Sequence, residues 1–155
     1  MRQDLLNNID PVVALAPGAG SADNTAIVSS ILDTAGFDSS MLVIIAGALH
    51  AGASFTVLLQ HGNAADMSDA TSVTAEALTE ELGVGVSQSG ITSAELSADF
   101  IAAQATQCFK LGYVGGKRYV RATITPAGGG ATSYLAAVWL RGHPRNAPTP
   151  NPPGH

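Results

Sequence analysis

The sequence is short of charged residues and of aromatic side chains. Of its 155 residues, 12% are Asp, Glu, Lys or Arg, about half the usual share, and 5% are aromatic. Because 46% of the residues are hydrophobic, this low charge argues against an intrinsically disordered chain. So sparsely charged a surface is typical of a protein that covers much of itself with partner subunits.

Cysteine is almost absent, and so is any targeting segment. Cys108 is the single cysteine, so no internal disulfide can form and nothing indicates an oxidising compartment. We expect Cys108 to be a small, half-buried apolar residue. The N-terminus has no basic region followed by an apolar stretch, which predicts that no secretory signal is present.

No acidic residue follows Asp99. Residues 1–109 hold all twelve acids and one base, a formal charge of −11, whereas residues 110–155 hold six bases and no acid. The basic C-terminal strands could pair with acidic residues of the same fold. Alternatively, the basic part of one copy could bind the acidic part of another copy, or an acidic partner surface. A whole-chain pI near 5.1 argues against nucleic-acid binding.

The densest apolar stretch, residues 41–61, lacks the hydrophobic centre of a membrane helix. A span needs about 20 predominantly apolar residues, but the small and polar segment 50–54 interrupts this one. Both halves are rich in β-branched or aromatic residues, which favours buried strands. We predict a β-hairpin at the centre of a soluble β-domain.

Glycine and proline divide the rest of the chain into further short elements. We predict strands over 12–15, 25–32, 106–114, 119–125 and 133–140. The last three are expected to form an antiparallel meander with a tight turn at Gly115–Gly116. Alternation in 119–125 points Val120, Ala122 and Ile124 inward. Residues 71–82 fit either a helical turn or a strand, and residues 93–105 suggest a helix.

These elements predict a mainly β protein, an antiparallel β-sandwich of the jelly-roll-like kind. Residues 1–11 would form an extended N-terminal arm and residues 12–142 the sandwich domain. The tail, residues 143–155, holds five of the eight prolines and cannot fill a core. It is expected to be exposed or to lie along a neighbouring subunit.

Searches for catalytic and ligand-binding patterns give negative results. Gly115-Gly116-Lys117 lacks both the earlier glycine and the following Ser or Thr of a phosphate loop. Ser87 lacks the second glycine of a nucleophile elbow. The four histidines have no metal-ligand spacing on a helix face. We therefore predict a protein that is not an enzyme and that has no cofactor and no metal.

Three stretches together look familiar as a family pattern. They are Asp33-Thr34-Ala35-Gly36-Phe37, then 55–59 through Gly62, Ala65 and Asp66, and finally 112–121 ending at 142–144. Over about residues 30–145 this order resembles a family of small virion proteins of tailed bacteriophages and prophages. The better-understood members of that family are capsid cement or decoration proteins with jelly-roll-like folds.

The resemblance implies a protein on the virion surface, and in the host cytoplasm during assembly, that clamps major capsid subunits as a dimer or trimer. The residues predicted to contact the major capsid protein are Arg118, Tyr119, Arg121, Arg141, His143, Pro144 and Arg145. Arg suits such contacts through its bidentate geometry and Tyr through its area. For Arg121, pairing with an acid of the same subunit is the alternative.

Two other functions fit the sequence. A neck or tail protein of the virion would differ from a shell protein in copy number rather than in residue chemistry. A carbohydrate-binding β-sandwich on the virion would require more exposed aromatic side chains than a 5% total supplies.

Overall fold

A computed structural model gives the fold of the chain over residues 4–18, 25–73, 78–81, 96–101, 107–128 and 132–149, with backbone only for 78–81 and 96–101. The described residues contain strands and no helix. The strands are β1 (Ile9–Leu15), β2 (Ile27–Val28), β3 (Leu32–Asp33), β4 (Phe37–Ala46), β5 (Ser54–Gly62), β6 (Thr71–Ser72), β7 (Leu78–Glu81), β8 (Leu96–Ile101), β9 (Cys108–Tyr113), β10 (Tyr119–Ala127) and β11 (Leu135–Pro144). The chain is therefore mainly β, as predicted.

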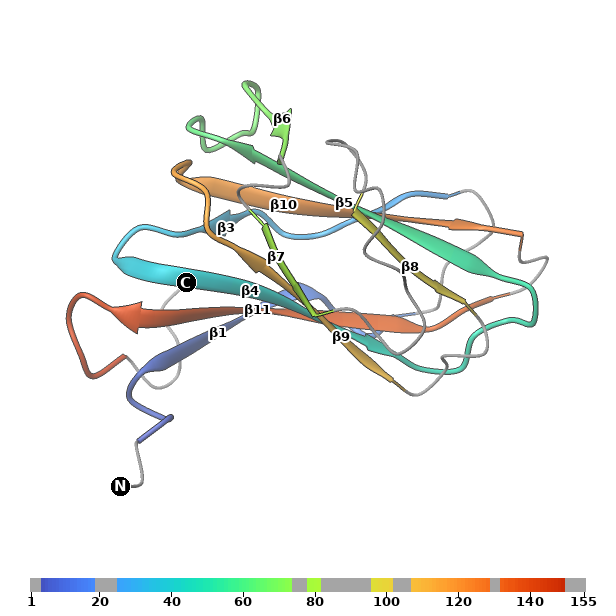
Figure 1. Cartoon of the computed structure of the whole chain (residues 1–155), viewed down its shortest axis with the longest axis horizontal. Coiled ribbons are helices and arrows are strands. Elements are labelled where there is room, and N and C mark those ends of the chain that lie inside the picture. Colours follow the sequence, from blue (N-terminus) through green and yellow to red (C-terminus); the bar gives the residue numbers. More distant parts are fainter. Residues whose placement is uncertain are drawn as a thin grey trace.

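The strands form two antiparallel sheets, which Figure 1 shows as two layers. Sheet I has the order β1-β11-β4-β9-β7. Sheet II has the order β2-β10-β5-β6, with β3 also paired to β10 and β8 also paired to β5. Every strand pairing is antiparallel.

One hydrophobic core takes side chains from both sheets. Leu42, Ile44 and Trp139 of sheet I are fully buried, and so are Phe55 and Val57 of sheet II. The predicted inward residues of 119–125 are confirmed, because Val120, Ala122 and Ile124 are all buried. Alternation along the long strands turns every second side chain into this shared core.

The prediction of a central hairpin over 41–61 is wrong. β4 pairs with β11 and β9 in sheet I, whereas β5 pairs with β10, β6 and β8 in sheet II. The connection between them crosses from one sheet to the other, and this crossing brings the buried face of β4 opposite that of β5. Gly52 and Gly128 allow it, since both have positive φ and a Cβ on Gly128 would lie 2.9 Å from the Gly52 carbonyl oxygen.

The predicted meander is also wrong, because β9 and β11 belong to sheet I and β10 to sheet II. Gly115–Gly116 lies in a connection between sheets rather than in a tight hairpin turn. The buried Tyr113 holds this connection, since its hydroxyl accepts a hydrogen bond from Lys117 N at 3.0 Å. A Cβ on Gly115 would lie 2.5 Å from the same hydroxyl oxygen.

Two further predicted elements differ from those observed, and a third takes one of its two predicted alternatives. The stretch 25–32 forms two short strands, β2 and β3, both paired to β10. Within the predicted helix 93–105, residues 96–101 form strand β8 and the others lie outside the described residues. Of residues 71–82, the described ones include β6 and β7, which favours the strand alternative. Pairing with β5 and β9 outweighs weak helix propensity.

The strands extend past both predicted limits of the domain. Residues 9–11 belong to edge strand β1, where a proline is tolerated, and residues 143–144 end β11. Beyond β11, Thr149 is buried and its hydroxyl donates to the carbonyl oxygen of Ile9 at 3.1 Å. The first part of the predicted tail therefore packs against the start of β1.

The outward sides of the sheets differ in chemistry. Sheet I presents Val13, Met41, Val43, Ile45, Val138 and Leu140, whereas sheet II presents Thr56, Leu58, Gln60, Arg121, Thr123 and Thr125. We call the first set the apolar face. The second set is rich in hydroxyl groups.

Candidate functional site

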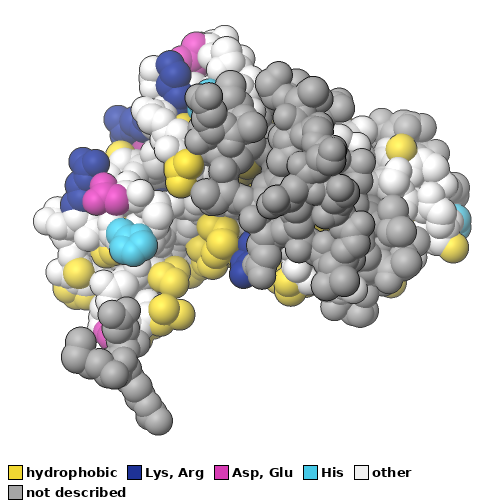
Figure 2. Space-filling model, in the orientation of Figure 1, with side chains coloured by type: hydrophobic (Ala, Val, Ile, Leu, Met, Phe, Trp, Pro, Cys, Tyr) yellow, Lys and Arg dark blue, Asp and Glu magenta, His cyan; other side chains and the backbone are white. Residues whose placement is uncertain are grey.

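Charged side chains gather at one end of the molecule. Figure 2 shows Lys, Arg, Asp, Glu and His side chains at its left, where Figure 1 places the β3–β4 turn and the end of β11. We call this region the polar end. Its residues are Asp33, Asp38, Ser39, Arg118, Arg141, His143 and Arg145.

Asp33 and Arg118 form a bidentate ion pair at the polar end. Arg118 donates from Nε and Nη2 to the two carboxylate oxygens at 2.9 and 2.8 Å. The hydrogen bond from Arg118 holds the pKa of Asp33 below its usual value, and the same contact raises the pKa of Arg118. The guanidinium also lies 5.1 Å from the ring centre of Tyr119. Geometry of this kind holds the arginine in one place at the surface.

Arg141 is the buried cation of the polar end. Its side chain is 14% exposed, and it pairs with Asp10, which is 1% exposed and directly opposite it across β1 and β11. It also donates to the carbonyl oxygen of Asp33 at 2.8 Å and lies 4.5 Å from the ring centre of Phe37. Arg141 thus ties β1, β3 and β4 to β11 and is not free to meet a partner.

Arg145 and His143 lie at the rim. Arg145 Nε donates to Asp38 at 2.9 Å, and both side chains are more than half exposed. His143 Nδ1 lies 2.8 Å from Ser39 Oγ. A serine nucleophile needs a histidine base that a third group orients, and in the part of the chain that the structure describes no carboxylate bonds to His143. The Ser39–His143 contact links the start of β4 to the end of β11.

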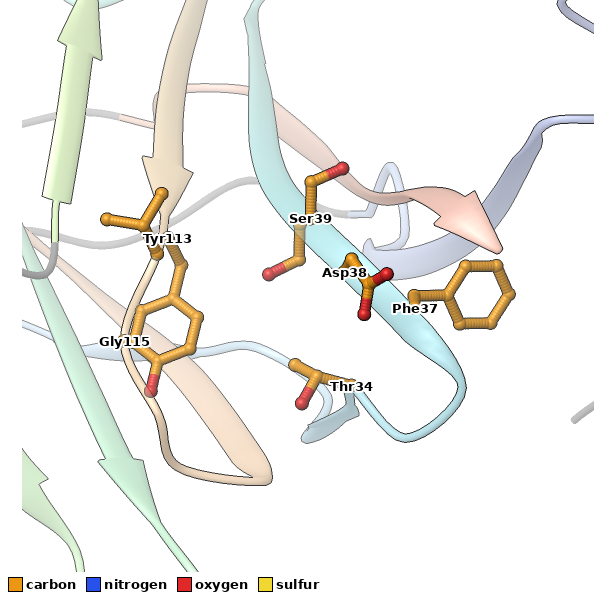
Figure 3. A pocket seen from close by; sticks show the side chains of 8 residues that line it. Thr34, Phe37, Asp38, Ser39, Tyr113 and Gly115 are labelled. Atoms are coloured by element: carbon orange, nitrogen blue, oxygen red, sulfur yellow. The ribbon is translucent and has the colours of Figure 1, made fainter. Parts of the chain in front are cut away.

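A small open pocket lies beside these pairs (Figure 3). Its volume is about 110 Å³, well below the roughly 300–1,000 Å³ of ordinary ligand sites. The wall residues come from the β3–β4 turn, the start of β4 and the end of β9: Thr34, Phe37, Asp38, Ser39, Ser40, Tyr113, Val114 and Gly115. This pocket can hold a few water molecules or one side chain of a partner.

Behind the pocket, Tyr113 links the two sheets through hydrogen bonds. Its hydroxyl lies 2.9 Å from His61 Nδ1 on β5. Burial raises the pKa of Tyr113, and burial together with the charge of Lys117 lowers the pKa of His61. Both groups are therefore held in their neutral forms near pH 7, which suits a structural bridge.

The carboxylates of Asp66 and Asp69 close the loop after β5. Asp69 accepts from the backbone N–H groups of Asn63 and Ala64, and Asp66 accepts from Ser68. These backbone bonds lower the pKa of each carboxyl group. Within the described residues no group of three His, Cys, Asp or Glu side chains is placed to hold a metal ion.

The structure places four of the seven predicted contact residues in the polar end and two more, Tyr119 and Pro144, next to it. Arg118, Tyr119, His143, Pro144 and Arg145 lie at the ends of β10 and β11, and Arg141 lies beneath them. Arg121 is separate, on the outward side of sheet II. There it donates to Gln60 at 2.7 Å, and no acid among the described residues pairs with it.

Sequence reasoning missed the acidic partners. Asp10, Asp33 and Asp38 each pair with one of the C-terminal arginines, which favours the first of the two explanations for the charge asymmetry. The separation of acids and bases along the chain indicated that ion pairs could form, but it did not specify which acid pairs with which arginine. Cys108, predicted to be half-buried, is exposed on β9.

Comparisons with known proteins give no relative: no family model, no curated protein and no solved structure matches this chain. Among the described residues, no helix is long and apolar enough to cross a membrane.

Proposed function

We propose that this chain is a structural virion protein, a cement or decoration protein that binds and stabilises the shell of major capsid protein. In this proposal the two sheets form a jelly-roll-like β-sandwich, and the residues before β1 and the end of the Pro-rich tail extend from it. The protein acts as a homo-oligomer on the capsid surface and needs no cofactor.

One observation carries the proposal: the polar end presents exposed, paired charges on the ends of rigid strands. The Asp33–Arg118 and Asp38–Arg145 pairs are fixed by β3, β4 and the ends of β10 and β11. Side chains that are already ordered lose less conformational entropy on binding than flexible ones. On a shell that repeats the same site many times, linked copies make even a weak contact effective.

The single tryptophan does not support the carbohydrate-binding alternative. Trp139 is fully buried and donates from Nε1 to the Ser30 carbonyl oxygen at 3.3 Å, so it offers no sugar platform. A neck or tail role requires the same rigid contact surface as a shell role. Copy number separates these two roles.

The first test is to count the copies of this protein in purified particles by quantitative mass spectrometry. Hundreds of copies per particle support a shell protein. A few copies, or about a dozen, would assign the chain to the neck or tail, and absence from particles would overturn the proposal.

The second test is charge reversal at the polar end. We expect Arg145→Glu to weaken sedimentation with shells of the major capsid protein at least about tenfold, because the exposed pair with Asp38 is lost at the contact. The free energy of unfolding should change by no more than about 1 kcal/mol, since exposed pairs contribute little. Thr125→Glu, on the outward side of sheet II, is the control and should bind like the wild type. Unchanged binding of Arg145→Glu would remove the polar end from the contact.

A further inference from the structure

The small pocket at the polar end takes part of its wall from the inner side of sheet I. The register places Arg141, Ser40 and Tyr113 in one row across β11, β4 and β9, and residues directly opposite each other on antiparallel strands share a face. Leu42 and Ile44, the next residues on this side of β4, are fully buried. The pocket therefore lies where the hydrophobic core ends and the polar end begins.

Ser40 brings an unpartnered hydroxyl group to this pocket. The residue is 7% exposed and lines the pocket, and within the described residues no hydrogen bond joins its Oγ to another group. On one side of it, Arg141 pairs with Asp10. On the other side, the Tyr113 hydroxyl bonds to His61. Buried hydroxyl groups are rarely left without a partner, so Ser40 Oγ indicates a place where a polar group from outside the chain binds.

Two further side-chain oxygens of the wall are hydrogen-bond acceptors. Thr34 Oγ1 donates its hydrogen to the Arg118 carbonyl oxygen at 2.9 Å, which leaves only its lone pairs for a ligand. Asp38 accepts from Arg145 Nε through Oδ1 at 2.9 Å, and its Oδ2 makes no bond in the part of the chain that the structure describes. Asp38 is also the one charged side chain among the described wall residues. Figure 3 shows Thr34, Asp38 and Tyr113 around the opening, which is therefore suited to a positively charged hydrogen-bond donor.

We propose that this pocket binds the ammonium group of a lysine side chain from a partner protein. An ammonium group has three N–H donors and no acceptor, which matches the oxygens of Ser40, Thr34 and Asp38. A guanidinium group presents five donors in one plane, more than these three oxygens accept. The volume of about 110 Å³ admits one side chain and excludes larger ligands. The proposal does not depend on the protein's being part of a virion.

The rim of the pocket also suits a lysine side chain. Val114 is largely exposed there and offers an apolar surface to the alkyl stem, while the charged head reaches the oxygens below. Arg145 does not block the site, because its side chain is mostly exposed and occupies one of the two carboxylate oxygens of Asp38. Exposed pairs of this kind contribute little, so the incoming ammonium group shares the carboxylate with Arg145 at low cost.

The test titrates the full chain with Nα-acetyl-lysine methylamide and follows the backbone amide signals by NMR. The signals of Ser40 and Gly115 should shift and saturate with a dissociation constant of about 1–10 mM. Nα-acetyl-norleucine methylamide has the same carbon stem without the ammonium group and should leave these signals unchanged. Asp38→Asn should raise the dissociation constant at least about tenfold and Ser40→Ala at least about fivefold, since each weakens a charge-assisted hydrogen bond. Ser133→Ala is the matched control, because Ser133 is also buried but bonds to His50 N, away from the pocket, and it should bind like the wild type.

Asp38→Asn protects the test against misfolding, because the Asp38 side chain is more than half exposed and circular dichroism should stay unchanged. A titration without saturable shifts up to about 50 mM would overturn the proposal. So would equal binding of the norleucine compound, or wild-type binding by both Asp38→Asn and Ser40→Ala. A titration with 1,5-diaminopentane distinguishes a protein-borne lysine from a free amine. If this compound bound more than about tenfold tighter than the lysine compound, the pocket would be assigned to a free amine and the protein partner would be ruled out.

Discussion

Val138 and Thr123 occupy equivalent places in the two sheets. Each lies near the middle of a long central strand and points away from the core. Val138 has Val13 and Val43 as cross-strand neighbours, whereas Thr123 has Val28 and Leu58. Both neighbourhoods contain apolar side chains, but the threonines along β10 supply hydroxyl groups that β11 lacks. The outward sides of β10 and β11 therefore differ in how well they are hydrated, whereas Val and Thr both favour strands.

Two of the ion pairs, one in each sheet, differ in the same direction. In sheet I, Asp10 and Arg141 face each other across β1 and β11 and are nearly out of contact with water. In sheet II, Asp33 of β3 meets Arg118 at the start of β10, and their side chains are 39% and 55% exposed. Sheet I thus holds its pair almost out of water, and sheet II leaves its pair partly solvated.

The buried pair of sheet I should give the largest effect. We expect Asp10→Ala to lower the free energy of unfolding by about 3–5 kcal/mol, because Arg141 would keep its buried charge without a carboxylate. Asp33→Ala, in sheet II, should cost no more than about 1 kcal/mol, since its pair is solvated. Urea denaturation of both variants measures the contrast.

Equal losses in these two variants would contradict the comparison. Asp10→Asn serves as a matched control for shape. It keeps the side-chain volume and a hydrogen-bond acceptor while removing the charge. Its free energy of unfolding should therefore lie between that of the wild type and that of Asp10→Ala.

The strand assignments show how far the sequence determines this fold. Alternation in 119–125 correctly gave the buried side of β10, because the period of a strand is local information. The same reasoning found the mainly β class and the strands on both sides of segment 50–54. Which strands pair with which is not local. Both β4 and β5 have a strongly apolar side, and that pattern fits neighbours in one sheet as well as partners across a core.

For the candidate site, the sequence identified the cations but not their environments. Arg118 and Arg141 are both arginines near strand ends, and no local sequence pattern distinguishes them. The fold separates them, because Arg141 stands opposite Asp10 on a neighbouring strand while Arg118 meets Asp33 at an open edge. Burial of a charge depends on the sheet order, which no local pattern specifies.

The pH dependence of the Asp33–Arg118 pair should give the smallest effect. The hydrogen bond from Arg118 lowers the pKa of Asp33 in the folded protein, so the carboxylate favours folding while it is ionised. This contribution is fully present above the unfolded-state pKa of about 3.9 and is lost as the pH falls through the lower folded-state pKa. The exposure of the pair limits it to about 1 kcal/mol or less.

Asp33→Asn removes the titrating group and provides the measurement. The wild type should be more stable than Asp33→Asn by a constant amount between about pH 5 and pH 7, and the difference should shrink below about pH 4. Urea denaturation across this range follows the difference directly. A difference that grows on acidification would mean that protonated Asp33 favours folding more than the ionised form, which would reverse the sign of the interaction in sheet II. A stability difference that is independent of pH down to about pH 2 would show that the charge of Asp33 does not stabilise the fold. The hydrogen bond from Ala35 N to Asp33 Oδ1, at 2.9 Å, would then be its main contribution.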